Sequence, residues 1–579
     1  MSFETIPQMI LRAGRERGTA DAYAVRRDDR WVTTSWVDYA GEVAAAARGL
    51  IGLGVEAGSP VAILGTNTPE WVIFDVAAMA VGAMPAGIYP TNSPDECAYV
   101  LDHSRSSVVL VQNEKQLAKV LERGGELPAL RHIVLMRGQS SESDGVLTWG
   151  QFLDRGTTVP FSDVESRMAA LGPRDGATLI YTSGTTGRPK AVVLPHEALV
   201  STTEAIKSFI DAGMSDSAVS YLPLSHIAEQ LVTILTPAVS GHAVYYEPDI
   251  FRLLDTLKEV RPSIFFAVPR VWEKFYAVVS GKMEEASGVK AAIANRALVV
   301  GREHTATLNR GEQPQAWLAS QYGFFDKLVY SKVKTAMGLD RSRFLFSGAA
   351  PLAPSIPEFF SGFGMQILNI YGQSENTAGC AYNRPNRNRF GSVGPAFPGA
   401  ELRIADDGEI LARGPSVFSE YLYNSEATLD ALGGDGWLHT GDVGYIDDDG
   451  FLFITDRKKD IIITAGGENV TPSLIEMTLQ TNSLIAIVVV MGDQRPFLTA
   501  LVSIDPEAAE GMSDDEIRAD VQGAVDDVNA DSARVRQLKK FVVLDRPLSI
   551  EHGELTPTLK VRRKVVREHF ADEIEGMYS

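Results

Sequence analysis

The residues with the clearest chemical potential form the run Tyr181-Thr182-Ser183-Gly184-Thr185-Thr186-Gly187-Arg188-Pro189-Lys190, directly after an apolar stretch. Its glycines let the backbone turn tightly and direct N–H groups at an anion, its hydroxyls add donors, and its two cations add charge. We therefore expect residues 182–190 to form a phosphate cradle. A flexible surface turn is the ordinary alternative for this composition, but the preceding strand and the terminal lysine favour the cradle.

A second group, Tyr371-Gly372-Gln373-Ser374-Glu375-Asn376-Thr377, follows the apolar residues 366–370. A tyrosine at the carboxyl end of a strand can stack on a purine, and a nearby carboxylate can hold a magnesium ion that bridges phosphates. Glu375 is the candidate ligand. Taken alone, a Tyr-Gly turn with a solvated glutamate is the commoner explanation. Upstream, the small residues Gly348, Ala349 and Ala350 would let a flat base approach the backbone, although the same turn could serve packing only.

Three further signals are weaker when each is taken alone. Asp442 is followed fifteen positions later by Arg457, and an aspartate and an arginine together can bind the hydroxyls of a ribose. By itself, Gly-Asp is only a turn. Lys560 precedes a basic tail, where solvated charge is the default and a mobile catalytic lysine the sharper alternative. His226 lies among apolar residues, and a lone histidine in such a place is usually a hydrogen-bonded core residue.

Several familiar motifs are absent. Gly184 is followed by Gly187 and Lys190 rather than by the Gly-Lys-Ser/Thr of a Walker A loop, which disfavours a P-loop kinase or GTPase. His196 lacks the second histidine of a zinc-protease helix, and Ser374 lacks the final glycine of a nucleophile elbow.

The elements that must position these residues alternate. Short apolar runs at residues 61–64, 107–111, 132–136 and 177–181 are separated by helical patterns, which predicts an α/β fold with buried, mostly parallel sheets. Residues 279–339 resemble a helical insertion. From about residue 394 the pattern becomes rich in strands, and the basic residues after Asp456 indicate a boundary. We expect a large domain over residues 1–456 with a β-rich subdomain, and a small α+β domain over residues 457–579.

Composition limits the partners. The 579 residues carry 54 Lys and Arg against 74 Asp and Glu, a net charge of −20, so a protein that coats nucleic acid is not expected. Two cysteines, far apart in sequence, exclude a disulfide framework and indicate a reducing, cytoplasmic setting. Residues 71–90 are too interrupted for a membrane span, and we expect a buried helix that runs into a loop. Peripheral contact with a bilayer stays open, and the sequence indicates no oligomeric state.

Taken in order, these segments resemble the core motifs of the adenylate-forming, AMP-binding superfamily, over nearly the whole chain. Within it, residues 266–274, the helical insertion, the hinge at residues 456–460 and the ending at residues 555–560 are similar to long-chain fatty acid–CoA ligases. Ala191, Ser374 and the pair Thr558-Leu559 depart from the commoner residues, but none of these changes removes a charge that the chemistry needs.

The resemblance implies roles for individual residues. Thr182, Ser183, Gly184, Thr185, Thr186, Gly187 and Lys190 would hold the β- and γ-phosphates of ATP, with Thr182 and Glu375 at the Mg²⁺. Tyr371, followed by Gly372, Gln373 and Ser374, would stack on adenine beside Gly348, Ala349 and Ala350, and Asp442 and Arg457 would bind the ribose. Lys560 would reach into the site during adenylation, Lys459 would be the hinge of a mobile C-terminal domain, and His226 would line the carboxylate end of the acyl site.

The implied function is ATP-dependent ligation of a long-chain fatty acid to coenzyme A through an acyl-AMP intermediate. A fatty carboxylate has a pKa near that of Glu, about 4.3, so it is already a nucleophile at neutral pH and needs mainly neutralisation of phosphate charge. Three alternatives stay open: a fatty acyl–AMP ligase that loads a carrier protein, a catalytically inactive nucleotide-binding regulator, and an oxygenase of the luciferase type.

Overall fold

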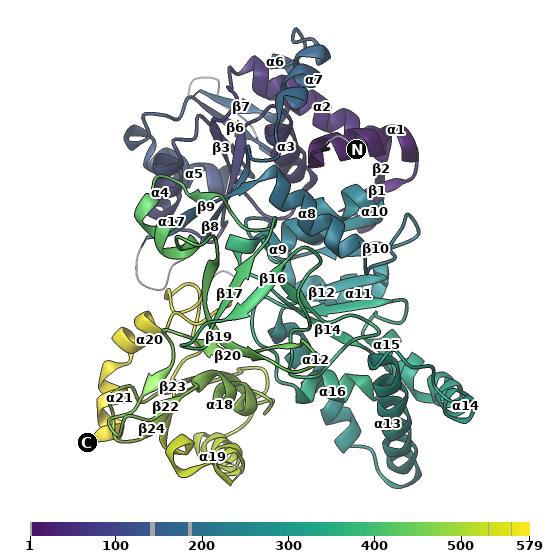
Figure 1. Cartoon of the computed structure of the whole chain (residues 1–579), viewed down its shortest axis with the longest axis vertical. Helices are drawn as coiled ribbons and strands as arrows, with labels where there is room; N and C mark the ends of the chain where they lie inside the picture. The colour runs from purple at the N-terminus through teal and green to yellow at the C-terminus, as the bar shows by residue number, and fades with distance from the viewer. Residues whose placement is uncertain (1–2, 139–144, 183–187, 531, 557–558) are drawn as a thin grey trace.

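The computed structural model describes residues 3–138, 145–182, 188–530, 532–556 and 559–579. Figure 1 shows a large N-terminal part and a smaller C-terminal part, which lies at the lower left and carries the C-terminus. The predicted class is confirmed: two large sheets with helices, a strand-rich subdomain and a small α+β domain make up the chain.

The first large sheet has the order β18-β9-β8-β4-β3-β5-β6-β7. Its strands from β8 to β7 are parallel, while β9 and β18 continue it antiparallel. The bounds are β3 (Pro60–Leu64), β4 (Met84–Ile88), β5 (Val108–Val111), β6 (His132–Leu135), β7 (Val146–Thr148), β8 (Gly176–Thr182), β9 (Lys190–Pro195) and β18 (Glu420–Tyr421).

Both faces of this sheet are buried, which explains its unbroken apolar runs. In β3, Val61 and Ile63 belong to the main core, whereas Ala62 and Leu64 belong to a second core, because successive side chains of a strand point to opposite faces. The second core lies under α4 (Pro94–Ser104) and α5 (Glu114–Glu122), which contribute Cys97 and Val120. The residues of this sheet that favour strands are therefore also the ones that the fold buries.

The expectation of a loop after the helix at residues 71–90 is wrong. After α3 (Pro69–Ala80) the chain forms β4, which lies between β3 and β8. Pro85 and Gly87 usually count against a central strand, but complete burial between two parallel neighbours overrides that preference. Gly87 has a packing reason, since a Cβ there would lie 2.7 Å from the Cα of Ser225.

The second large sheet has the order β15-β14-β13-β12-β10-β11-β1-β2, with antiparallel strands at both edges. Its inner neighbours are parallel. The bounds are β1 (Asp21–Arg27), β2 (Arg30–Ser35), β10 (Ser217–Ser220), β11 (Ala243–Tyr246), β12 (Ile264–Ala267), β13 (Phe344–Ser347), β14 (Ile367–Tyr371) and β15 (Ala381–Tyr382).

Several helices of the large part, among them α2 (Trp36–Gly52), α3, α4, α5 and α6 (Trp149–Arg155), begin at a capping side chain. Before α4, the Ser93 hydroxyl accepts from the N–H of Glu96, the Glu96 carboxylate accepts from the N–H of Ser93, and Pro94 occupies the first turn. The helices are α1 (Ile6–Arg17), α2 (Trp36–Gly52), α3, α4 (Pro94–Ser104), α5 (Glu114–Glu122), α6 (Trp149–Arg155), α7 (Phe161–Ala170), α8 (His196–Lys207), α9 (Ile227–Gln230), α10 (Thr236–Ser240), α11 (Leu253–Val260), α12 (Pro269–Glu284), α13 (Gly288–Asn309), α14 (Ala316–Phe325), α15 (Ser331–Ala336) and α16 (Ser355–Ser361). Short 3₁₀ or π segments are η1 (Gly124–Glu126), η3 (Leu231–Leu235), η4 (Ile250–Arg252), η5 (Asp326–Tyr330) and η6 (Ser374–Asn376).

The strand-rich subdomain is an antiparallel sheet of order β16-β17-β19-β20. Its strands are β16 (Glu401–Ile404), β17 (Glu409–Arg413), β19 (Leu438–Ile446) and β20 (Leu452–Arg457), and α17 (Ser425–Leu432) precedes β19. A turn at residues 447–450 joins β19 to β20. The Asp447 carboxylate accepts from the N–H groups of Asp449 and Phe451, which holds this turn closed.

The small domain has a three-stranded sheet of order β23-β24-β25 with helices on both faces. Its elements are β21 (Ile462–Ile463), β22 (Asn469–Val470), α18 (Pro472–Leu479), β23 (Ile485–Met491), β24 (Leu498–Ile504), α19 (Asp514–Ala530), η7 (Arg534–Arg536), β25 (Leu538–Val543), α20 (Arg563–His569) and α21 (Ala571–Tyr578). Val488 and Val490 face one core under α18 and α19, while Val489 and Met491 face another under α20 and α21.

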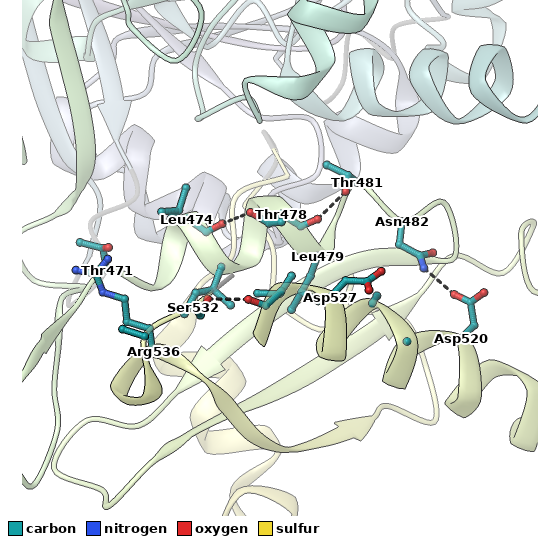
Figure 2. A pocket seen from close by; sticks show the side chains of 15 residues that line it. Thr471, Leu474, Thr478, Leu479, Thr481, Asn482, Asp520, Asp527, Ser532 and Arg536 are labelled. Carbon is teal, nitrogen blue, oxygen red and sulfur yellow. Dashed lines mark hydrogen bonds between the residues drawn. The ribbon is translucent and has the colours of Figure 1, made fainter. Parts of the chain in front are cut away.

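A pocket lies between α18 and α19 in the small domain, and Figure 2 shows it lined by Leu474, Thr478 and Asp527. At one end Asn482 donates a 2.6 Å hydrogen bond to Asp520. None of the residues discussed as nucleotide or acyl ligands lines this pocket. Within the described ranges no helix combines the length and the apolar character that a membrane span needs.

Candidate active site

Four side chains meet where β14 ends against the subdomain sheet. Tyr371 donates a 2.6 Å hydrogen bond to the Asp442 carboxylate, and Gln373 donates to the same oxygen at 2.7 Å. Arg457 lies 3.3 Å from the other Asp442 oxygen. Asp442 is buried, so these donors replace the water that would otherwise solvate its carboxylate. The structure thus brings together the residues predicted for the adenine and ribose ends of a nucleotide.

The register of a hairpin explains the pairing of Asp442 with Arg457. The two residues lie directly opposite each other in the antiparallel β19–β20 ladder. Gln373 also donates to the carbonyl of Thr440, which joins η6 to β19. Gly372 is required at its position, because a Cβ there would lie 2.1 Å from the backbone of Ala378. The neighbouring Ser374 begins η6 and is buried.

The small-residue turn follows β13. Gly348 is buried, and Ala349 has the left-handed φ of 68°. Ala350 is exposed at the end of the turn. The buried hydroxyl of Ser347 has no hydrogen-bond partner among the described residues. A polar atom of a bound base would satisfy that hydroxyl, so this turn fits a nucleotide on an observation that is independent of the motif.

The residues predicted to bind phosphates lie on and beside β8, β9 and β18. Thr182 and Lys190, the two ends of the predicted cradle, are partners in the β8–β9 ladder, and Ser183, Gly184, Thr185, Thr186 and Gly187 lie outside the described residues. The Lys190 ammonium lies 4.5 Å from the ring centre of Tyr421. The hydroxyl of the same tyrosine donates a 2.7 Å hydrogen bond to Glu375. Tyr421 therefore links the lysine and the carboxylate predicted for the phosphates and the metal.

The donor set fits magnesium bound together with a nucleotide. Among the described residues, no cluster of three or more His, Cys, Asp or Glu could hold a metal by itself. Mg²⁺ commonly uses one or two carboxylates and completes its shell with substrate phosphates and water. Glu375, which Tyr421 holds by a hydrogen bond, could supply the carboxylate. Such an ion would neutralise phosphate charge while pyrophosphate leaves.

Lys560 from the small domain lies within electrostatic range of this site. Burial, together with the positive charge of Arg457, lowers the pKa of Lys560 to about 8, while the charges of Asp442 and Glu375 oppose that shift. Burial and the charge of Lys560 also lower the pKa of His226 to about 3. His226 is therefore neutral at neutral pH, and its Nδ1 accepts from the N–H of Ala228 as the cap of α9. The charge of Lys560, from the small domain, thus acts on His226 of the large domain.

Two anchors hold the small domain in this arrangement. Asp456, at the end of β20, accepts from the N–H and the hydroxyl of Ser473 at the start of α18. On the other side, Arg270 of α12 lies 2.9 Å from Asp505, which follows β24. Lys459, the predicted hinge residue, follows β20 at the start of the small domain, and desolvation of its amine together with the cations Arg457 and Lys190 lowers its pKa.

Sequence reasoning missed two residues that organise the site. Tyr421 lies 46 residues from Glu375, and its short strand gives no periodic signal. Glu554 begins the segment that ends at Lys560, and its fully buried carboxylate accepts from Arg546 at 2.9 Å and contacts His569 at 3.0 Å. Only the spacing of Glu554 before Lys560 could have suggested a role for it.

Comparison with known proteins identifies the family. Residues 13–422 match the AMP-binding enzyme family, and residues 459–579 match the AMP-binding enzyme C-terminal domain. The long-chain-fatty-acid–CoA ligase FadD15 of Mycobacterium tuberculosis is 37% identical over all of this chain and 97% of its own length. The long-chain-fatty-acid–CoA ligase ACSBG2 of Xenopus laevis is 34% identical over 99% of this chain and 84% of its own length.

A solved structure shares the fold. The adenylation domain of a carboxylate reductase from Mycobacterium chelonae superposes with a TM-score of 0.78 at 22% identity, over the whole of this chain and 92% of that chain. The architecture of layered sheets, strand-rich subdomain and small terminal domain is therefore that of adenylation domains. With both of its parts matched, the chain belongs to the AMP-binding enzyme family and is an adenylate-forming enzyme.

Proposed function

We propose that this enzyme is an ATP-dependent long-chain fatty acid–CoA ligase. The observation that carries the substrate class is the similarity, along the whole chain, to relatives named as long-chain-fatty-acid–CoA ligases. The meeting of Lys560 with the charges of Asp442, Arg457 and Glu375 supports an adenylation site shared by the two domains. ATP, a long-chain fatty acid and CoA are the substrates, and Mg²⁺ is the metal cofactor.

In the first step the fatty carboxylate attacks the α-phosphate and pyrophosphate leaves. The carboxylate is ionised at neutral pH and needs no general base. Lys190 would stabilise the departing pyrophosphate, while Lys560 would hold the carboxylate and the α-phosphate together. Neutral His226 would line the carboxylate end of the acyl site without competing for the negative charge of the substrate.

In the second step the thiol of CoA displaces AMP from the acyl-adenylate. We propose that the small domain leaves the arrangement described here, so that Lys560 withdraws and the thiol can approach. Lys459 at the hinge would absorb the backbone rotation. Lys560→Ala should then slow pyrophosphate release far more than thioester formation from supplied acyl-AMP, and Lys459→Pro should do the reverse.

The test is a panel of fatty acids of different chain lengths with ATP, magnesium and CoA, read by mass spectrometry of the products. Acyl-CoA from long-chain acids supports the proposal. Accumulation of acyl-AMP without a thioester would identify a fatty acyl–AMP ligase that loads a carrier protein. Absence of pyrophosphate release with every acid would indicate a catalytically inactive nucleotide-binding regulator, and oxygen consumption with light emission would indicate a luciferase-type oxygenase.

A further inference from the structure

The helices between β12 and β13 expose large apolar side chains in addition to those that they bury against the core. We call α13, α14, η5 and α15 together, residues 288–336, the helical arm, which projects at the lower right of Figure 1, away from the small domain. Leu318, Phe325 and Tyr330 on its inner side are buried. Trp317 and Phe324, seven residues apart and so on one face of α14, are 48% and 63% exposed. One helix is thus apolar on its outer face as well as its inner face.

Other exposed apolar residues lie on the same arm. Leu328 continues the outer side beyond Phe324, and Val289 and Ile293 lie exposed in the first turns of α13. The Trp317 indole keeps its polar edge satisfied, since its N–H donates a 2.6 Å hydrogen bond to Gln315. A ring that exposes an apolar face and has a satisfied polar edge is typical of membrane interfaces.

The charge of the arm is opposite to that of the protein. Within a chain of net charge −20, residues 288–336 contain seven Lys and Arg against three Asp and Glu. Two of the acids, Glu312 and Asp326, are already paired with Arg310 and Lys334. Outside these pairs the arm carries one exposed acid, Glu303, and the exposed cations Lys290, Arg296, Arg302, Lys327 and Lys332.

From this combination we propose that the helical arm docks the enzyme on an anionic lipid bilayer. Exposed aromatic and aliphatic side chains would enter the interfacial region, and the surrounding cations would meet anionic headgroups, while the acidic remainder of the surface is repelled. The arm lies in the surface and does not cross it. The inference is independent of the proposed substrates, because it rests only on the surface of the arm.

The test measures co-sedimentation of the full chain, without ATP or CoA, with two kinds of vesicle. One is pure phosphatidylcholine, and the other contains equal parts of phosphatidylcholine and phosphatidylglycerol. We expect binding to the anionic vesicles, loss of most of it in high salt, and binding to neutral vesicles weaker by about tenfold or more. Equal binding to both vesicles, or binding to neither, overturns the proposal.

Two pairs of variants locate the surface. Trp317→Ser with Phe324→Ser, and Lys327→Glu with Lys332→Glu, should each weaken binding by about tenfold or more. The matched controls change the same residue types elsewhere: Phe251→Ser, at a side chain that is 94% exposed on η4, and Lys115→Glu with Lys207→Glu. The controls should bind like the wild type.

Wild-type binding by the arm variants, or equal losses in the controls, overturns the proposal. If Trp317→Ser with Phe324→Ser lowers the thermal stability, vesicle binding by Lys327→Glu with Lys332→Glu decides whether the arm is the docking surface. A wild-type dimer that the arm variants convert to a monomer, without vesicle binding, would identify a second copy as the occupant and overturn the proposal. Ligase activity in detergent-dispersed substrate is measured separately, so failure to bind vesicles leaves the proposed function untouched.

Discussion

The hydroxyl of Tyr421 donates a 2.7 Å hydrogen bond to the carboxylate of Glu375, and through it β18 of one large sheet contacts η6, the segment that follows β14 of the other sheet. The ring of the same tyrosine faces the Lys190 ammonium. Glu375 and Lys190 are the carboxylate and the cation that we assign to the metal and the leaving pyrophosphate. Tyr421 is therefore a positioning residue for both.

Tyr421→Phe should raise the magnesium concentration needed for half-maximal adenylation and slow adenylation about tenfold. The change removes one hydrogen bond to a charged group, worth roughly 1.5 kcal/mol, and keeps the ring beside Lys190. Pyrophosphate release at graded magnesium measures it. Tyr423→Phe is the control, because that side chain is 58% exposed two residues later. An unchanged magnesium dependence would show that Tyr421 does not position Glu375.

Adenylation should lose activity as the pH rises through about 8, because the pKa of Lys560 is lowered to about 8 by burial and the charge of Arg457. A lysine with a lowered pKa gives up its proton at a lower pH, so the cation is present below that value and lost above it. Arginine stays protonated throughout this range. Lys560→Arg should therefore be slower but without the alkaline decline, read from kcat/KM for pyrophosphate release. An alkaline decline that persists in Lys560→Arg would show that a group other than Lys560 causes it.

The contact between Arg270 and Asp505 should stabilise the arrangement in which Lys560 faces the site. Arg270→Gln should slow pyrophosphate release severalfold and leave thioester formation from supplied acyl-AMP unchanged or faster, since one partly buried ion pair is worth about 1 kcal/mol. Lys274→Gln is the matched control, because its partner Glu507 lies 3.7 Å away and both side chains are largely exposed. Equal losses in both half-reactions would argue against a role in domain arrangement.

Glu554→Gln should destabilise the small domain by roughly 2 kcal/mol at neutral pH. Burial raises the pKa of Glu554, but hydrogen bonds from Arg546 and His569 outweigh it and lower the pKa to about 2. An unfolded glutamate has a pKa of about 4.3, so this stabilisation is present above about pH 4.3 and is lost as the pH falls toward 2.

Thermal unfolding across this range measures the effect of Glu554→Gln. The gap in melting temperature between the wild type and the variant should close below about pH 4. Glu568→Gln, at a side chain that is 62% exposed, serves as the control and should leave the melting temperature unchanged. A gap that is independent of pH would mean that packing, rather than charge, explains the loss.

Much of the fold was accessible from local pattern. The apolar runs at residues 61–64, 107–111 and 132–136 correspond closely to observed strands, because β-branched residues buried on both faces satisfy strand propensity and burial together. The run MPAGI at residues 84–88 did not, since Pro85 and Gly87 oppose a strand locally. This segment is a strand because it pairs with β3 on one side and β8 on the other.

For the site, the sequence by itself determined which residue types are available and where each stands relative to its own strand or turn. The spacing of Asp442 and Arg457 around a turn is of this kind. Packing between separate elements brings Tyr421 to Glu375, places Lys560 of another domain within electrostatic range of Asp442, and lets Glu554 anchor the segment of Lys560. Periodicity reports burial within one element, whereas these contacts depend on how separate elements pack, and packing is set by the whole core at once.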